Sequence, residues 1–186
     1  MRTGLPFPRG TFSDDGGIIT VGDAVHAEME GLEFEVPDTQ HGLAQPVTLR
    51  IVKNDTGGDI TVARKCYDFT VASQGDIGGR IGALAGDGEV GYPLDDAYAV
   101  GATWPDDALG YIVVKGRCDV LTAATNNNYA VNTSVQIAAG GVLKDVAAAA
   151  AGAFVLGTLE YEAAYAAATA VCVNVGATMS LPPAAG

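Results

Sequence analysis

The chain has 186 residues, of which 48% are hydrophobic, and its 22 acidic and 10 basic residues give a formal net charge of −12. This length and apolar content exclude a wholly disordered chain and allow one or two compact domains. The negative charge repels phosphate backbones and no cluster of Lys and Arg offsets it, so we expect no nucleic acid partner. The acidity serves solubility or, alternatively, docking onto a basic partner surface.

Residues 1–17 are predicted to form an extended N-terminal arm. They contain two prolines, several glycines and no clear period. The first eight residues lack the apolar core of a secretory signal, and no later apolar run reaches the ~18 residues that a membrane helix requires. We therefore expect synthesis and assembly in the cytoplasm and no membrane partner. The arm either latches onto a neighbouring protein or is a frayed terminus.

Period-two alternation of apolar and polar residues predicts strands in the first half of the chain. These strands span 18–21, 32–36, 47–52 and 67–71. Asn54 to Gly58 supply turn residues between 47–52 and the run 60–62, which predicts a β-hairpin. Asn54 also begins a glycosylation sequon, which we interpret as a chance match.

The segment 75–101 is dense in Gly and Asp and is predicted to be a long, partly irregular connection. A domain boundary is expected near Trp104 and Pro105. The predicted organisation is therefore an arm at 1–17, a β-rich domain at 18–105 and a second β-domain at 106–186.

In the second half, short strands separated by turns are predicted at 111–116, 118–121, 135–137, 154–159 and 170–175, with the last two as a pair. The alanine runs 147–151 and 160–168 favour helix but are shorter than the ~12 residues that an isolated helix needs, so we expect loops or one short helix. The predicted fold class is all-β, with short-stranded β-barrel or β-sandwich modules and an extended N-terminal arm.

Residue types that support catalysis are sparse. The chain has two histidines, His26 and His41, and none of its four serines lies in a Gly-x-Ser-x-Gly motif. The glycine-rich run 75–82 lacks the Lys-Ser/Thr pair of a phosphate-binding loop. We therefore predict no catalytic residue and no cofactor, and expect the chain not to be an enzyme. A carboxylate-dependent hydrolase stays open, because its paired carboxylates come from distant strands.

No metal site is predicted from residue spacing. The three cysteines are far apart and form no CxxC motif, so they are expected to be free and mostly buried: Cys66, Cys118 and Cys172. Acidic pairs at 87 and 89 and at 106 and 107 do not match the spacing of a calcium-binding loop, and we interpret them as solvated turn residues.

The segment from Tyr111 to Val175 resembles the small β-barrel of the capsid decoration, or cement, proteins of tailed phages. The resemblance rests on the strand-like run 154–160, the Ala-rich spacers on either side of it, and the closing alternation in 171–175. It covers about a third of the chain and is one of strand and spacer style. The portion before about Gly110 is longer than in the smallest members of that family.

This resemblance implies a homotrimeric virion protein on the outer capsid surface, which clamps neighbouring major capsid subunits. The arm would pin the protein to those subunits through Leu5, Phe7 and Phe12. The alternative is a tail or fibre module that binds a host-surface glycan or protein, which would present an exposed aromatic or polar cleft around Trp104 and Tyr92.

Overall fold

The computed structural model describes twelve segments of the chain: 19–20, 29–38, 40–41, 45–61, 63–69, 79–98, 103–123, 128–129, 134–145, 155–160, 163–164 and 169–176. The predicted arm at 1–17, with Leu5, Phe7 and Phe12, lies outside these residues, and so do the alanine run 147–151 and most of 160–168.

Within the described segments the chain forms fifteen β-strands and no α-helix. The all-β prediction is confirmed, and no helix in these segments is long and apolar enough to cross a membrane. The strands are β1 (Ile19–Thr20), β2 (Glu33–Pro37), β3 (Pro46–Asn54), β4 (Ile60–Thr61), β5 (Cys66–Phe69), β6 (Arg80–Leu84), β7 (Tyr92–Pro93), β8 (Thr103–Trp104), β9 (Ala108–Leu121), β10 (Asn128–Tyr129), β11 (Ser134–Ala138), β12 (Val142–Asp145), β13 (Gly157–Leu159), β14 (Ala163–Ala164) and β15 (Ala170–Val175).

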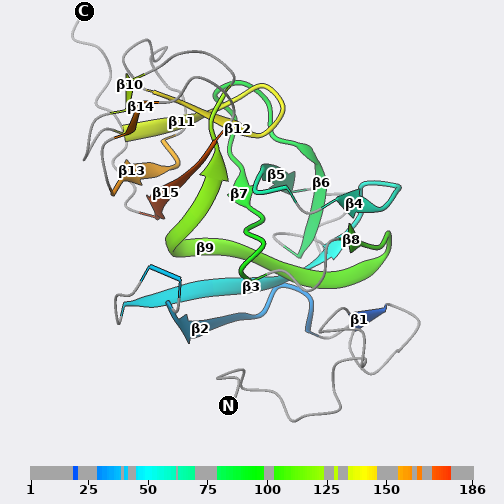
Figure 1. Ribbon diagram of the computed structural model, residues 1–186. Helices are drawn as coiled ribbons and strands as arrows, with labels where there is room; N and C mark the ends of the chain where they lie inside the picture. Colours follow the sequence, from blue (N-terminus) through cyan, green and yellow to red (C-terminus); the bar gives the residue numbers. More distant parts are fainter. Residues whose placement is uncertain are drawn as a thin grey trace, which may run out of the picture.

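Eleven strands join in one mixed sheet with the order β12-β11-β13-β15-β9-β3-β6-β5-β7, to which β1 adds at β9 and β2 at β3 (Figure 1). Two further ladders, β10–β14 and β4–β8, stand apart from it. The sheet of the described residues does not close into a barrel, because its ladder stays open at β12. The separate β-domain at 106–186 stays a prediction. A single parallel bridge from Thr122 to Leu143 brings β12 back toward the end of β9 without closing the ladder.

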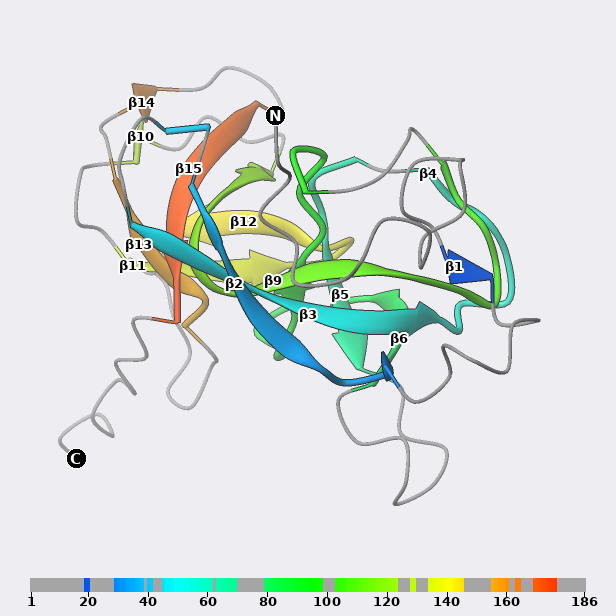
Figure 2. The same cartoon turned by 90° about the horizontal axis from the view of Figure 1, so that it is seen from below.

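The long strand β9 connects the two halves of this sheet. From Leu109 to Lys115 it pairs with β3, and from Gly116 onward it pairs with β15. A register shift opposite Thr48 and Leu49 and a φ of 103° at Gly116 mark the change of partner. Figures 1 and 2 show β9 lying along β3 and then turning to lie beside β15. The two short strands predicted at 111–116 and 118–121 are thus one strand with a bend.

Both faces of the β3–β9 pair are buried. Leu49, Ile51 and Val113 belong to a large apolar cluster that continues into β11, β13 and β15. Val52 and Ile112, which point to the opposite face, belong to a second cluster that includes Trp104. The predicted boundary near residue 105 stays a prediction, although the sheet and both clusters include residues from each side of it.

The predicted hairpin between 47–52 and 60–62 is wrong, because β4 pairs with β8 instead of β3. Asn54 explains the difference. Its fully buried side chain donates through Nδ2 to the carbonyl oxygens of Gly58, Trp104 and Pro105, at 3.0–3.1 Å. These hydrogen bonds direct the chain after the turn toward 103–105. They also give Asn54 a structural role, which fits the interpretation of its sequon as a chance match.

The predicted irregular connection at 75–101 contains two strands, β6 and β7, in its described part. β6 adds to β3 in parallel, and Ile81 on β6 is fully buried in the second apolar cluster. The prediction of a partly irregular connection did not identify these strands, because Gly and Asp dominate the composition around a strand of only five residues.

We predict that Asn54→Asp destabilises the fold by about 2–4 kcal/mol, because a buried carboxylate would face three carbonyl oxygens and lose every donated hydrogen bond. Urea denaturation measures the loss. Asp55→Asn, at the next position in the same turn, is the control and should shift the midpoint little. Equal stability of Asn54→Asp and the wild type would contradict the role assigned to Asn54.

We also predict that Gly116→Ala destabilises the sheet by about 1–3 kcal/mol, since an L-residue is strained at this φ. In addition, a Cβ there would lie 3.0 Å from Val47 Cα. Gly58→Ala is a matched control, because a Cβ at Gly58 meets nothing within 4 Å. Thermal denaturation of both variants should lower the Tm of Gly116→Ala alone. Similar Tm values for the two would contradict a required bend at Gly116.

Candidate functional site

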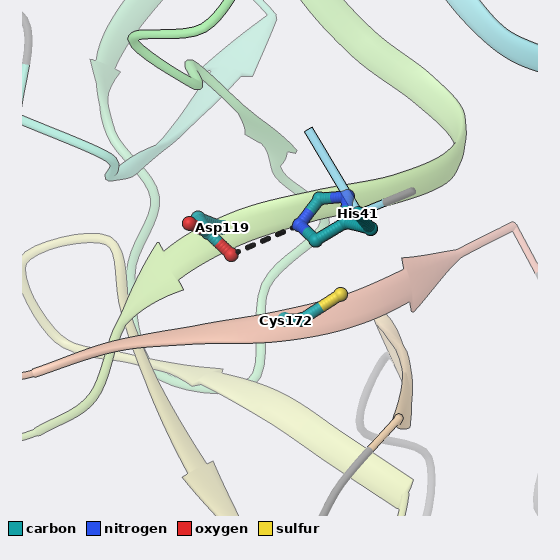
Figure 3. Close-up of side chains that lie close together, drawn as sticks. All are labelled: His41, Asp119 and Cys172. Carbon is teal, nitrogen blue, oxygen red and sulfur yellow. Dashed lines mark hydrogen bonds and ion pairs between the residues drawn. The ribbon is translucent and has the colours of Figure 1, made fainter. Parts of the chain in front are cut away.

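Three side chains with chemically different donor atoms come together where the β2–β3 connection meets β9 and β15 (Figure 3). His41 comes from the turn after β2, Asp119 from β9 and Cys172 from β15. One nitrogen, oxygen or sulfur from each residue lies within 4.8 Å of the others. We call these three residues the His-Asp-Cys cluster.

The sheet itself sets the position of two members of the cluster. Asp119 and Cys172 are directly opposite one another in the antiparallel β9–β15 ladder, so their side chains share a face. Their neighbours Cys118 and Val173 are also opposite, and both point into the large apolar cluster. Asp119 and Cys172 therefore lie on the face turned away from that core, and Cys172 is nevertheless only 2% exposed.

Asp38 orients the third member, His41. The buried carboxylate of Asp38 accepts hydrogen bonds from the backbone N–H groups of Gln40 and His41, at 3.0 and 3.1 Å. The same carboxylate lies 3.1 Å from His41 Nδ1, while His41 Nε2 lies 3.3 Å from Asp119 Oδ1. The imidazole is thus held between two carboxylates, with Nε2 turned toward the cluster.

Arg64 holds the other oxygen of Asp119. Its guanidinium donates to Asp119 Oδ2 at 3.1 Å and to Asp96 Oδ1 at 2.7 Å. Burial raises the pKa of Asp96, but its hydrogen bonds with Arg64 and Asp95 and the charge of Arg64 together outweigh burial and lower the pKa. The arginine therefore favours the ionised form of Asp96 and fixes the orientation of Asp119.

Asp95 is a buried carboxyl on the side of β9 that does not face β15. It accepts the backbone N–H of Asp119 at 2.7 Å and that of Ala97 at 3.0 Å. Burial raises the pKa of Asp95 to about 6 despite these two hydrogen bonds. The hydroxyl of Tyr98 is also buried, has no hydrogen-bond partner among the described residues, and has its pKa raised by burial and by the charges of Asp38 and Asp95.

The arrangement does not suit nucleophilic catalysis by Cys172. Burial, and then the charges of Asp119 and Glu160, raise the pKa of this thiol to about 12. A catalytic cysteine requires a lowered pKa, because the thiolate is the nucleophile. In addition, His41 Nε2 lies within hydrogen-bonding distance of Asp119, which is not the group that a general base for Cys172 would contact. The cluster instead offers one nitrogen, one oxygen and one sulfur donor at short range.

Two sequence predictions about other residues have clear outcomes. All three cysteines are free and buried, as predicted. The exposed cleft predicted around Trp104 and Tyr92 for a host-binding module is wrong at Trp104, which is 3% exposed and donates through Nε1 to the carbonyl oxygen of Ala108. A Cβ at Gly110 would lie 2.5 Å from the indole ring, so the absence of a side chain there makes room for it.

Tyr92 is half-buried and packs on Phe69, with ring centroids 4.4 Å apart. The guanidinium of Arg50 lies 5.1 Å from the Phe69 ring centroid and 5.9 Å from that of Tyr92. Of the two residues around which the cleft was predicted, Tyr92 is therefore the one that reaches the surface, and its neighbour Phe69 was not predicted.

Sequence reasoning missed the His-Asp-Cys cluster, because His41 and Asp119 are 78 residues apart. One signal was present in the sequence. The alternation in 171–175 places Val171, Val173 and Val175 on one face and therefore Cys172 on the other, polar face. Which residues lie opposite Cys172 depends on strand pairing, and the sequence does not determine that pairing.

No protein-family model and no curated protein matches the chain. Among solved structures, it is similar to the N-terminal base of the head fiber protein gp8.5 of bacteriophage phi29. The similarity has a TM-score of 0.43 and 14% identity, and it covers 70% of this chain and 94% of that chain. These values are too low to indicate a shared function.

We predict that the free energy of unfolding carries a pH-dependent contribution from Asp95. Its pKa rises from 3.8 to about 6 on folding, so between these values the native state binds more protons than the unfolded state. Stability from this group is therefore lost as the pH rises from 4 to 6, by on the order of 1–3 kcal/mol.

Urea denaturation of the wild type and of Asp95→Asn across this pH range tests the prediction. The variant loses one acceptor and is less stable overall. The informative quantity is therefore how the difference in free energy of unfolding between the wild type and the variant changes with pH. We expect that difference to shrink from pH 4 to pH 7. A difference that stays constant across the range would show that Asp95 titrates normally.

Proposed function

We propose that this protein is a structural component of a tailed-phage virion, which binds the outer surface of the assembled capsid and stabilises it by clamping neighbouring major capsid subunits. The observation that carries the proposal is the β9–β15–β13 ladder. Its strands β13 and β15 come from the segments on which the resemblance to decoration proteins rests, with Leu159 opposite Val173 and Val173 opposite Cys118 on β9. The predicted pairing of the last two strands is thereby confirmed.

The edge strands of the sheet are poorly suited to pair with a strand of a capsid subunit, which favours binding through the arm instead. Along β2, Glu33 and Glu35 are exposed and Pro37 ends the strand. β7 has two residues and ends in Pro93, and the short strand β12 carries Lys144. Charges, prolines and short strands at an edge oppose pairing with another chain. Contact with capsid subunits therefore falls to the arm and its apolar residues Leu5, Phe7 and Phe12.

Symmetry and charge fit the same role. A homotrimer at the local threefold positions of an icosahedral shell would present three arms at once, and the linked contacts would strengthen binding without a large individual interface. The net charge of −12 favours association with a basic outer surface. The raised pKa of the Cys172 thiol agrees with a role that involves no catalysis.

We predict that deleting residues 2–17 abolishes capsid binding while the sheet remains folded. The measurement is co-sedimentation of the purified protein with DNA-free shells assembled from the major capsid protein of the candidate phage. Light scattering of the free protein reports whether it is a trimer, and circular dichroism reports whether the truncated chain is folded.

A triple variant, Leu5→Ser, Phe7→Ser and Phe12→Ser, separates apolar contacts from arm length. It should lose at least tenfold in apparent affinity, whereas Arg2→Ser with Thr3→Ser, in the same arm, should bind like the wild type. Undiminished pelleting of the truncated protein would refute the arm, and a folded wild type that never pellets with the shells would refute the capsid role itself.

One observation favours the alternative, a tail or fibre module that binds a host-surface glycan or protein. Tyr92 and Phe69 form a half-buried aromatic pair beside Arg50, and aromatic and guanidinium groups are common in binding sites. If the wild type ignores capsids, a glycan-binding screen that compares it with Tyr92→Ala would test this second function.

A further inference from the structure

We propose that His41, Asp119 and Cys172 form a Zn²⁺ site, with His41 Nε2, Asp119 Oδ1 and Cys172 Sγ as ligands. The three atoms already lie within 4.8 Å of one another, and the first two are 3.3 Å apart. Ligand atoms around a tetrahedral zinc ion, at about 2.0–2.3 Å from it, are separated by about 3.3–3.8 Å. Zinc binding on this proposal requires the more widely separated ligand atoms to approach by about 1 Å.

The donor set selects the metal. Calcium and magnesium prefer oxygen ligands, whereas a thiolate combined with an imidazole favours zinc and similar transition metals. Two of the ligands come from the sheet face opposite the apolar core and the third from the turn after β2. Figure 3 shows the three side chains directed toward one another. This differs from the spacing-based expectation of no metal, which considered only ligands that are close in sequence.

Two neighbouring groups already hold the ligands in a suitable orientation. The Asp38 carboxylate lies 3.1 Å from His41 Nδ1, which favours the tautomer with its lone pair on Nε2. A carboxylate at the outer nitrogen of a metal-binding histidine is a recurrent arrangement at zinc sites. Arg64 holds Asp119 Oδ2 and leaves Oδ1 for the ion.

The site combines burial with access. Cys172 is 2% exposed, while the side chains of His41 and Asp119 are 16% and 22% exposed, so an ion can enter from the solvent side. Three protein ligands leave a fourth position for water. A bound ion would join the 38–41 turn to β9 and β15 and would stabilise the folded chain by mass action.

The alternative is a cluster held only by hydrogen bonds, in which a protonated His41 bridges Asp38 and Asp119. Both states explain the observed distances, but they differ in the behaviour of Cys172. A metal requires the sulfur as a ligand, whereas the hydrogen-bonded cluster does not use it. The test therefore measures whether the Cys172 sulfur binds the metal.

The experiment treats the full chain with a chelator, removes the chelator, and titrates Co²⁺ as a spectroscopic substitute for zinc. We expect a thiolate-to-cobalt charge-transfer band in the near ultraviolet, saturating at one equivalent, together with visible bands typical of tetrahedral cobalt. Added Zn²⁺ should remove both. Zn²⁺ should also raise the Tm of the wild type. Absence of the charge-transfer band in the folded wild type would overturn the proposal.

Variants identify the ligands. Cys172→Ala should abolish the charge-transfer band, and His41→Ala and Asp119→Asn should each weaken cobalt binding at least tenfold. Cys118→Ala is the matched control, because Cys118 is a buried free thiol next to Asp119 that points into the apolar core. A band that persists in folded Cys172→Ala, or one lost only in Cys118→Ala, would refute this ligand assignment. Circular dichroism establishes that each variant is folded.

The outcome is independent of the proposed capsid role. Metal binding is measured on the isolated chain, and capsid binding is measured by co-sedimentation. If the chain binds zinc but not capsids, the metal-site proposal stands and the capsid role is refuted. If it binds capsids but not zinc, the capsid role stands and the metal site is refuted.

Discussion

The bend of β9 at Gly116 is the constraint on which most of the structure depends. Before the bend the strand pairs with β3, and after it the strand pairs with β15, so a single strand belongs to both halves of the sheet. The bend requires a backbone conformation with φ of 103°, which glycine tolerates and other residues rarely adopt. It also turns the distal part of β9 so that Cys118 and Val120 extend the large core while Asp119 faces the polar side. The candidate site exists because of this change of direction.

Among the described residues, the distal part of β9 pairs with a strand on one side only, and loops supply hydrogen-bond partners on the other side. Asp95 accepts the N–H of Asp119, and the carbonyl oxygen of Arg64 accepts that of Leu121. Buried backbone donors without partners would be costly, so these loops are required for the strand to stay in place. Asp95 is buried in making this contact, and burial raises its pKa to about 6. The polar network around Asp119 is therefore part of the architecture as well as the candidate site.

Sequence patterns predicted the strands well where apolar and polar residues alternate, as in β2, β3 and β15, and they predicted the pairing of β13 with β15. They failed where pairing depends on a single side chain or a single dihedral angle. The buried amide of Asn54 redirected the expected hairpin, and Gly116 joined two expected strands into one. The candidate site was not predicted from the sequence for a related reason. His41, Asp119 and Cys172 each lie in an ordinary local pattern, and only the β9–β15 register and the turn after β2 bring them together.

Cohesion between the two halves of the sheet must come from noncovalent contacts in the described residues, because the three cysteines there are free. The apolar core supplies most of it, since Leu49 and Ile51 on β3 share a cluster with Val171 and Val173 on β15. On the face opposite that core, the second apolar cluster covers β9 before the bend. After the bend the link on this face is polar, running from Asp38 through His41 to Asp119 and on to Arg64. This series of polar contacts links the turn after β2 to the distal part of β9. A zinc ion bound to His41, Asp119 and Cys172 would replace the weakest step of this series, the 3.3 Å contact between His41 and Asp119, with direct ligation.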